Sequence, residues 1–304
     1  MTPFRKREMI QADIVGLEDL LASAPNDPLA KPLAQSRVAE LREELGALEK
    51  SQPLVPETEL FFGQGPVLGA KGIEAKFAGQ VLDSFQDMVT NHFAAKYHGL
   101  LRRSGRRKGE AESKLFLTAL PRGSFGLQLS QPHVQDFVTA NQLATVMEDV
   151  TALVDAAGKD DQTFEDALTS THGRVLVPLK KFLEMLENSH ADCRIISGMK
   201  QAVLKKEQVS QAYDRVASAK TEEEPLELQG TFFGALVKTG RFDFEPKGQD
   251  IINGWLADEV TEDQAINMEQ LTGKPVLAKL KVTTVTTKTG RRRLTYELQT
   301  LDPI

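Results

Sequence analysis

The chain has 304 residues and a formal net charge of −6, with 40% hydrophobic and 26% charged residues. These proportions are typical of a globular protein of about two domains, and the acidic balance argues against strong, unspecific DNA binding by the whole surface. The single cysteine, Cys193, excludes an internal disulfide and fits a reducing compartment. The sequence has neither a signal peptide nor an apolar run of the roughly 18 residues that span a bilayer. We therefore expect a cytoplasmic protein without membrane association.

Residues 1–56 are predicted to form an amphipathic helical segment. The stretch "MIQADIVGLEDLLA" repeats apolar residues at spacings of three and four, as Ile10 and Ile14 do. After the proline-rich break "PNDPLAKPL", the stretch "SRVAELREELGALEK" repeats the pattern, with Ser36 as a candidate N-cap. Such helices pack on each other, on the next domain or on a partner, so we expect them to serve assembly and to permit an oligomer.

Residues 57–222 are predicted to form a helix-rich α+β domain with a small antiparallel sheet. A glycine-rich stretch, 57–72, precedes the strongest helical pattern. Two hairpins supply the strands: 115–120 with 125–130, and a second that turns at Ser197 and Gly198. Helices are expected at 73–97, 134–157, 162–171, 174–188 and 206–219.

Residues 223–304 are predicted to form a small β-barrel. The acidic stretch "KTEEEPLE" is expected to be a solvated linker. Five strand-like runs follow, with a short helix capped by Thr261 between the third and the fourth. The order β-β-β-α-β-β is that of the OB-type barrel, and an SH3-like barrel is the alternative. The predicted fold class is therefore α+β with three parts.

The sequence contains no intact catalytic motif. "RGSFG" lacks the first glycine of a nucleophile elbow and is followed by a strand pattern, so it predicts a hairpin whose glycines allow positive φ. "GPVLGAKG" departs from the Walker spacing. Gly69–Gly72 remains a candidate anion site if its N–H groups open the following helix.

Histidines and cysteine do not form a recognisable site either. None of the five histidines makes an H-x-x-x-H pair, and His92 is expected at the edge of the core. In "HADC", His190 and Cys193 should point in different directions if a strand begins there. Carboxylates occur in runs that are typical of solvated faces, although a pair assembled in space stays open. We predict no catalytic residue, no metal site and no cofactor.

Two basic clusters are the candidate binding residues for nucleic acid or another anion. The first is the loop "RRSGRRKG", which a solvated loop would also explain; its residues are Arg102, Arg103, Arg106, Arg107 and Lys108. The second lies in the barrel beside Phe242, Phe244, Trp255 and Tyr296; its residues are Lys279, Lys281, Arg291, Arg292 and Arg293. OB barrels bind single strands by stacking bases on aromatic side chains in a basic groove. The alternative is that the aromatic residues fill the barrel core.

Three segments together resemble a layout found in uncharacterised bacterial proteins. They are "AGQVLDSFQDMVT", "LFLTALPRGSFGLQL" and "GTFFGALVKTGRFDFEPKGQDIINGWL", within about residues 60–300. Such proteins often accompany defence or toxin–antitoxin genes. The resemblance implies an accessory protein and assigns no role to any residue.

These observations predict a non-catalytic binding or adaptor protein that engages a partner protein, single-stranded nucleic acid, or both. The alternative is a nuclease or nucleotide-processing enzyme with a dispersed site, favoured by the glycine-rich helix entrance and the basic loop. A third hypothesis is a structural subunit or an antitoxin-like partner.

Overall fold

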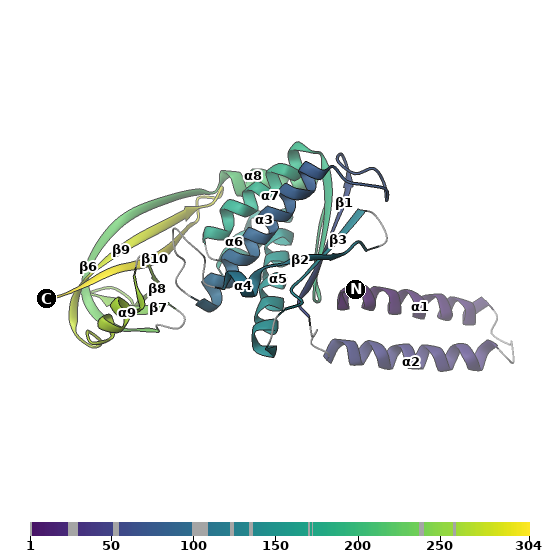
Figure 1. Cartoon of the computed structure of the whole chain (residues 1–304), viewed down its shortest axis with the longest axis horizontal. Helices are drawn as coiled ribbons and strands as arrows, with labels where there is room; N and C mark the ends of the chain where they lie inside the picture. Colours follow the sequence, from purple (N-terminus) through teal and green to yellow (C-terminus); the bar gives the residue numbers. More distant parts are fainter. Residues whose placement is uncertain are drawn as a thin grey trace.

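The computed structural model describes residues 2–23, 30–50, 55–98, 109–121, 125–133, 136–169, 171, 173–236, 240–257 and 260–304. The chain forms a helical hairpin, a helix-covered antiparallel sheet and a closed five-stranded β-barrel, in that order (Figure 1). The helices lie between the sheet and the barrel, and the hairpin lies on the other side of the sheet. The predicted α+β fold class with its three parts is confirmed.

The hairpin consists of α1 (Pro3–Ser23) and α2 (Ala30–Lys50), which lie side by side. Ile10 and Ile14 of α1 are buried against Val38 and Leu41 of α2. Ser36 is not an N-cap, because α2 begins six residues earlier, at Ala30. The prolines were interpreted as a break before the helix. Pro32 instead lies in the first turn of α2, where a backbone N–H would have no intrahelical partner, so proline is tolerated there.

The hairpin attaches to the sheet through the beginning of α1. Phe4 N–H donates to the Gly198 carbonyl at 3.1 Å, and Arg194 forms an ion pair with Glu8 at 2.7 Å. Arg5 lies 3.4 Å from the carboxylate of Glu59, which is completely buried in the sheet. The rest of the hairpin projects away from the domain (Figure 1).

The central sheet has five strands in the order β2-β3-β1-β4-β5, and every neighbouring pair is antiparallel. The two predicted hairpins are present as β2–β3 and β4–β5. The middle strand, β1, was missed, because buried Thr58 and Glu59 obscure its apolar pattern. The strands are β1 (Glu57–Gln64), β2 (Phe116–Ala119), β3 (Phe125–Ser130), β4 (Ala191–Ser197) and β5 (Lys200–Leu204).

A layer of helices covers one face of this sheet. Leu60 and Phe62 of β1 are buried in the same core as Phe85, Met147 and Phe182 from three different helices. The helical elements are α3 (Ala75–Phe93), η1 (Ala94–His98), α4 (Glu110–Ser113), α5 (Phe137–Gly158), α6 (Asp161–Thr169), η2 (Gly173–Val175), α7 (Leu176–Asn188) and α8 (Lys206–Ser218).

Gly126 of the "RGSFG" stretch is required by packing rather than by a positive φ. It lies opposite Phe61 in the pairing of β3 with β1, and a Cβ there would lie 2.7 Å from the Phe61 ring. Gly126 is not among the glycines with positive φ. Arg122, Gly123 and Ser124 lie outside the described residues.

The barrel closes in the order β6-β7-β8-β10-β9, with a parallel contact between β8 and β10. The predicted closed five-stranded barrel is present, and its helix between the third and fourth strands agrees with the OB-type order. Thr261 caps α9 as predicted, because its Oγ1 accepts a hydrogen bond from Gln264 N–H at 3.2 Å. The elements are β6 (Lys220–Leu236), β7 (Arg241–Pro246), β8 (Ile252–Leu256), α9 (Glu262–Glu269), β9 (Pro275–Thr286) and β10 (Arg292–Pro303).

The stretch "KTEEEPLE" is not a linker. It forms the first part of β6 and pairs with β9 from Lys220 onward, so the strand runs across the predicted domain boundary at residue 223. Pro225 is tolerated there because β7 pairs with β6 only from Gly230, which leaves this part of β6 with one unpaired edge. The long strands β6, β9 and β10 extend from the barrel to the helical layer (Figure 1).

Candidate functional site

The first predicted basic cluster lies outside the described residues, and this applies to all five of its members: Arg102, Arg103, Arg106, Arg107 and Lys108. The second cluster lies on β9, on β10 and in the turn between them. Its lysines have carboxylate partners on neighbouring strands. Lys279 lies 3.1 Å from Asp302, whose hydrogen bond and charge raise the pKa of the lysine. Lys281 lies 2.9 Å from Glu297; burial alone would lower its pKa, but Glu297 raises it.

Two arginines of this cluster attach the barrel to the helical domain. Arg293 donates to the Thr171 carbonyl at 2.7 Å, and burial lowers its pKa. Arg291 lies 3.4 Å from the carboxylate of Glu165 in α6. Arg292 is exposed. Four of the five residues therefore already contact a carboxylate or a carbonyl of the same chain. Nucleic-acid binding by this cluster stays a prediction.

The barrel aromatics divide between the core and the surface. Phe242 and Phe244 are buried in the barrel core, as the alternative explanation predicted. Trp255 is half-buried, and the Arg241 guanidinium lies 4.5 Å from the centre of its ring. Tyr296 is partly buried against the barrel core, whereas Phe233 of β6, which the sequence analysis did not single out, is 48% exposed.

The remaining sequence candidates have structural roles. In the Gly69–Gly72 turn, Lys71 N–H donates to the Leu68 carbonyl, and the Gly72 carbonyl accepts from Leu68 N–H. The turn does not open the helix directly, because α3 begins at Ala75. Cys193 lies in the hydrophobic core, where burial raises the pKa of its thiol, whereas His190 is exposed. Within the part of the chain that the structure describes, no three His, Cys, Asp or Glu side chains are grouped to hold a metal ion.

Buried His92 pairs with Asp149, which is partly exposed. His92 is 4% exposed, and its Nε2 lies 3.0 Å from Asp149 Oδ2, which also accepts from Lys96 at 2.7 Å. Burial alone would raise the pKa of Asp149, but His92 and Lys96 together lower it. Among the described residues, the other ring nitrogen, Nδ1, is buried without a hydrogen-bond partner. The arrangement resembles part of a catalytic triad but links α3 to α5.

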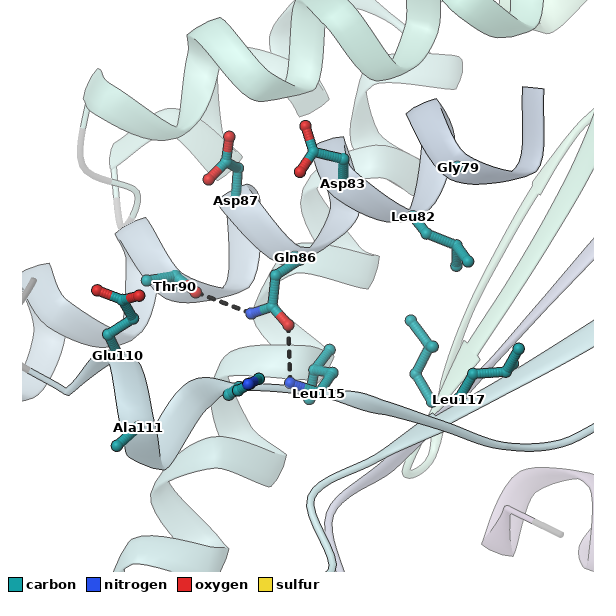
Figure 2. A pocket seen from close by; sticks show the side chains of 12 residues that line it. Gly79, Leu82, Asp83, Gln86, Asp87, Thr90, Glu110, Ala111, Leu115 and Leu117 are labelled. Carbon is teal, nitrogen blue, oxygen red and sulfur yellow. Dashed lines mark hydrogen bonds between the residues drawn. The ribbon is translucent and has the colours of Figure 1, made fainter. Parts of the chain in front are cut away.

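Apolar and charged groups converge at a groove between α3 and β2 (Figure 2). Its volume is 820 Å³. Leu115, Leu117 and Leu129 contribute from the sheet, and Leu82 contributes from α3. Leu117 is 53% exposed, although it pairs with buried Leu129. The remaining lining residues are Gly79, Asp83, Gln86, Asp87, Thr90, Glu110, Ala111 and Lys114.

The groove exists because the helical layer stops short of the edge of the sheet. β2 is an edge strand of the sheet, and among the described residues only β3 pairs with it. Gln86 bridges the gap at one end: its Nε2 donates to the Ser113 carbonyl at 2.9 Å, and its Oε1 accepts from Leu115 N–H at 2.7 Å. Figure 2 shows Gln86 reaching from α3 to Leu115, while Asp83 and Asp87 project from the other side of α3. Leu117 of β2 therefore remains exposed beyond this bridge.

Sequence reasoning missed this site for two reasons. Its residues come from α3, α4 and β2, and only the fold places them together. On α3 they recur at spacings of three and four and are mostly polar, which is also typical of a solvated helix face. The one available signal was the apolar run "LFLTAL" at the edge of the sheet, and its place at an edge was not visible in the sequence.

No protein-family model matches this chain, and neither curated proteins nor solved structures gave a match. These comparisons neither support nor contradict the resemblance to uncharacterised bacterial proteins. Among the described residues, no helix combines the length and apolar composition needed to cross a membrane.

Proposed function

We propose that this chain is a non-catalytic binding protein whose partner is another protein, held in the groove between α3 and β2. The observation that supports the proposal is the exposure of Leu117 on the inward face of an edge strand. A sheet normally buries one face, so an apolar position left open beside a groove is a place for a partner's apolar side chain. Burial of one such side chain contributes about 1.5–3 kcal/mol, which is in the range of an interface hot spot.

The charges of the groove favour a protein over a nucleic acid as its occupant. Among the lining residues that the structure describes are the carboxylates of Asp83, Asp87 and Glu110 and the lysine Lys114. A lining with more acidic than basic groups disfavours the binding of phosphates. The accessory role in a defence or toxin–antitoxin system belongs to this proposal, and the identity of the partner would decide it.

Replacing Leu117 with aspartate tests the proposal. We expect tagged Leu117→Asp protein, expressed in the native host, to lose at least tenfold of a partner that the unchanged protein retains, because the change places a charge on the apolar floor. The measurement is quantitative mass spectrometry of co-purified proteins at equal bait levels. The matched control is Leu294→Asp, since Leu294 is a similarly exposed strand residue, at 52%, in the barrel. If both variants retain the same proteins as the unchanged chain, the groove is not a protein-binding site.

A further inference from the structure

The helical hairpin at the start of the chain has one side on which several apolar side chains stay exposed. We propose that a second copy of this chain covers that side. In this dimer the two hairpins are antiparallel, so that α1 lies on α1 and α2 lies on α2 of a four-helix bundle. The interface is separate from the groove between α3 and β2, and it does not depend on the proposed function.

Two ion pairs between the helices distinguish the two sides of the hairpin. Lys6 of α1 lies 2.8 Å from Glu44 of α2, which marks the first side. Arg42 of α2 lies 2.7 Å from Glu18 of α1, which marks the second side. Because a helix turns once in 3.6 residues, the residues that share a side with each ion pair follow from their spacing along the chain.

The first side carries three of the exposed apolar residues. Met9, Leu20 and Leu33 are 54%, 46% and 72% exposed. Met9 lies three residues after the lysine of the first ion pair, Leu20 lies fourteen after it, and Leu33 lies eleven before its glutamate, so all three share its side. On the second side the exposed large apolar residue among those described is Val15, three residues before the glutamate of the second ion pair. The first side is therefore the apolar side.

The hairpin by itself buries only part of its apolar surface. Its core has a few buried side chains, those of Ile10, Ile14, Val38 and Leu41. Further leucines pack on this core but stay partly exposed; they are Leu17, Leu45 and Leu48. Helices bury their apolar stripes by packing in two layers, and two helical hairpins that pack together form a four-helix bundle. A second hairpin is therefore a suitable cover for the apolar side.

An antiparallel two-fold arrangement makes this side complementary to itself. An axis just beyond Ile14 lies midway between Met9 and Leu20, so it places Met9 of each copy opposite Leu20 of the other. Near the same level, α2 carries the ion pair of Arg37 with Glu40 at 2.9 Å. The axis reverses this pair in the second copy, so each Arg37 faces the Glu40 of the other copy. The four charges then form a network of alternating sign.

A parallel arrangement, with both hairpin tips at the same end, is less favourable. It would place α1 of each copy on α2 of the other and bring exposed Asp13 near Glu40, which are both acidic. The antiparallel arrangement avoids this repulsion. Because the hairpin projects from the central domain (Figure 1), it also places the two central domains at opposite ends of the bundle.

The size of the apolar side sets the expected strength of the dimer. Each helix has 21 residues, so the side is about 31 Å long and, with two helices of about 10 Å, about 20 Å wide. Such a side buries roughly 600 Å² per copy, near the lower end of the range for specific interfaces. We therefore expect a dimer that dissociates on dilution rather than a permanent one.

Matched substitutions on the two sides of α1 test the interface. Met9 and Val15 are exposed to nearly the same extent, at 54% and 56%, and differ in the side on which they lie. We expect sedimentation of the full-length protein over a concentration series to show a dimer, and Met9→Glu to raise its dissociation constant at least tenfold because a charge then faces Leu20 of the second copy. Val15→Glu should leave the dimer unchanged. A monomer at every concentration up to about 100 µM, or equal effects of the two variants, would overturn the inference.

Charge reversal on α2 tests the antiparallel arrangement. Arg37→Glu alone and Glu40→Arg alone would each place like charges across the two-fold axis, so each variant should dimerise at least tenfold more weakly than the unchanged protein. An equimolar mixture of the two variants brings opposite charges together again and should form a mixed dimer with the original strength. Such a recovery requires contact between α2 of one copy and α2 of the other, which the parallel arrangement lacks. Failure of the mixture to recover the dimer would overturn the antiparallel bundle.

Discussion

Replacing Gly254 with alanine is expected to lower the free energy of unfolding of the barrel by about 3 kcal/mol, the upper part of the range for overpacking a tight site. A Cβ at this position would lie 2.3 Å from the Tyr296 carbonyl oxygen of β10 and 2.7 Å from the Phe242 ring. The first neighbour is backbone, so it cannot be relieved by a change of rotamer. The strands β8 and β10 would have to separate.

The consequence is large because the barrel closes through few contacts at this point. The register of β8 with β10 consists of Trp255 opposite Glu297 and Leu256 opposite Leu298. Separation of these pairs would open the barrel and expose its core to water. The neighbouring Trp255 is the only tryptophan of the chain, so its fluorescence during urea unfolding reports on the barrel.

Gly79→Ala is the control for this prediction. Gly79 lies within α3, and a Cβ there meets no atom within 4 Å, so alanine should stabilise the helical domain by about 0.5–1 kcal/mol. Far-ultraviolet circular dichroism reports on that domain. Equal stability of Gly254→Ala and the unchanged protein by tryptophan fluorescence would show that the contact between β8 and β10 does not hold the barrel closed.

Replacing Glu165 with glutamine is expected to weaken the attachment of the barrel to the helical domain at neutral pH, by about 1–2 kcal/mol. Glu165 is 7% exposed and accepts hydrogen bonds from Thr287 at 2.5 Å and from Thr289, while Arg291 lies 3.4 Å away. The two threonine hydrogen bonds, followed by Arg291, hold the pKa of this carboxyl below its ordinary value of 4.5. An amide keeps one acceptor and loses the charge.

The pH dependence follows from the direction of that shift. A carboxyl whose pKa is lowered on folding stabilises the folded state when it is ionised, so its contribution is complete above pH 4.5. The contribution is lost as the pH falls through the lowered pKa of the folded state. We therefore expect the unchanged protein and Glu165→Gln to differ most at neutral pH and to converge in acid. A difference between their urea midpoints that stays constant from pH 7 to pH 3 would contradict this account.

The sequence was sufficient for those elements whose residues carry a local signal. Thr261 and Gln264 occupy the two positions of a capping box, and the structure contains that box. The hairpins β2–β3 and β4–β5 were visible because apolar alternation and turn residues are both local properties. The number of strands in the barrel and the helix between the third and fourth could be predicted for the same reason.

Other features depended on contacts between residues far apart in the chain. Glu222–Glu224 and Pro225 have the composition of a linker, yet these residues form a strand because β9 lies beside them and Lys281 lies 3.5 Å from Glu223. The basic cluster of the barrel could be found from its composition, whereas its partners could not. Glu165 is more than 120 residues from Arg291, and burial of a carboxylate is invisible in a sequence.

The sequence by itself therefore determined the three parts of the chain, most of its helices and strands, and the absence of a recognisable catalytic motif. Only the tertiary structure decided that β1 lies at the centre of the sheet and that β2 lies at its edge. The groove follows from that order, because the helices cover the middle of the sheet and stop before β2. Local propensity depends on neighbours in the chain, whereas an open edge depends on which strands pair and on how far the covering layer extends.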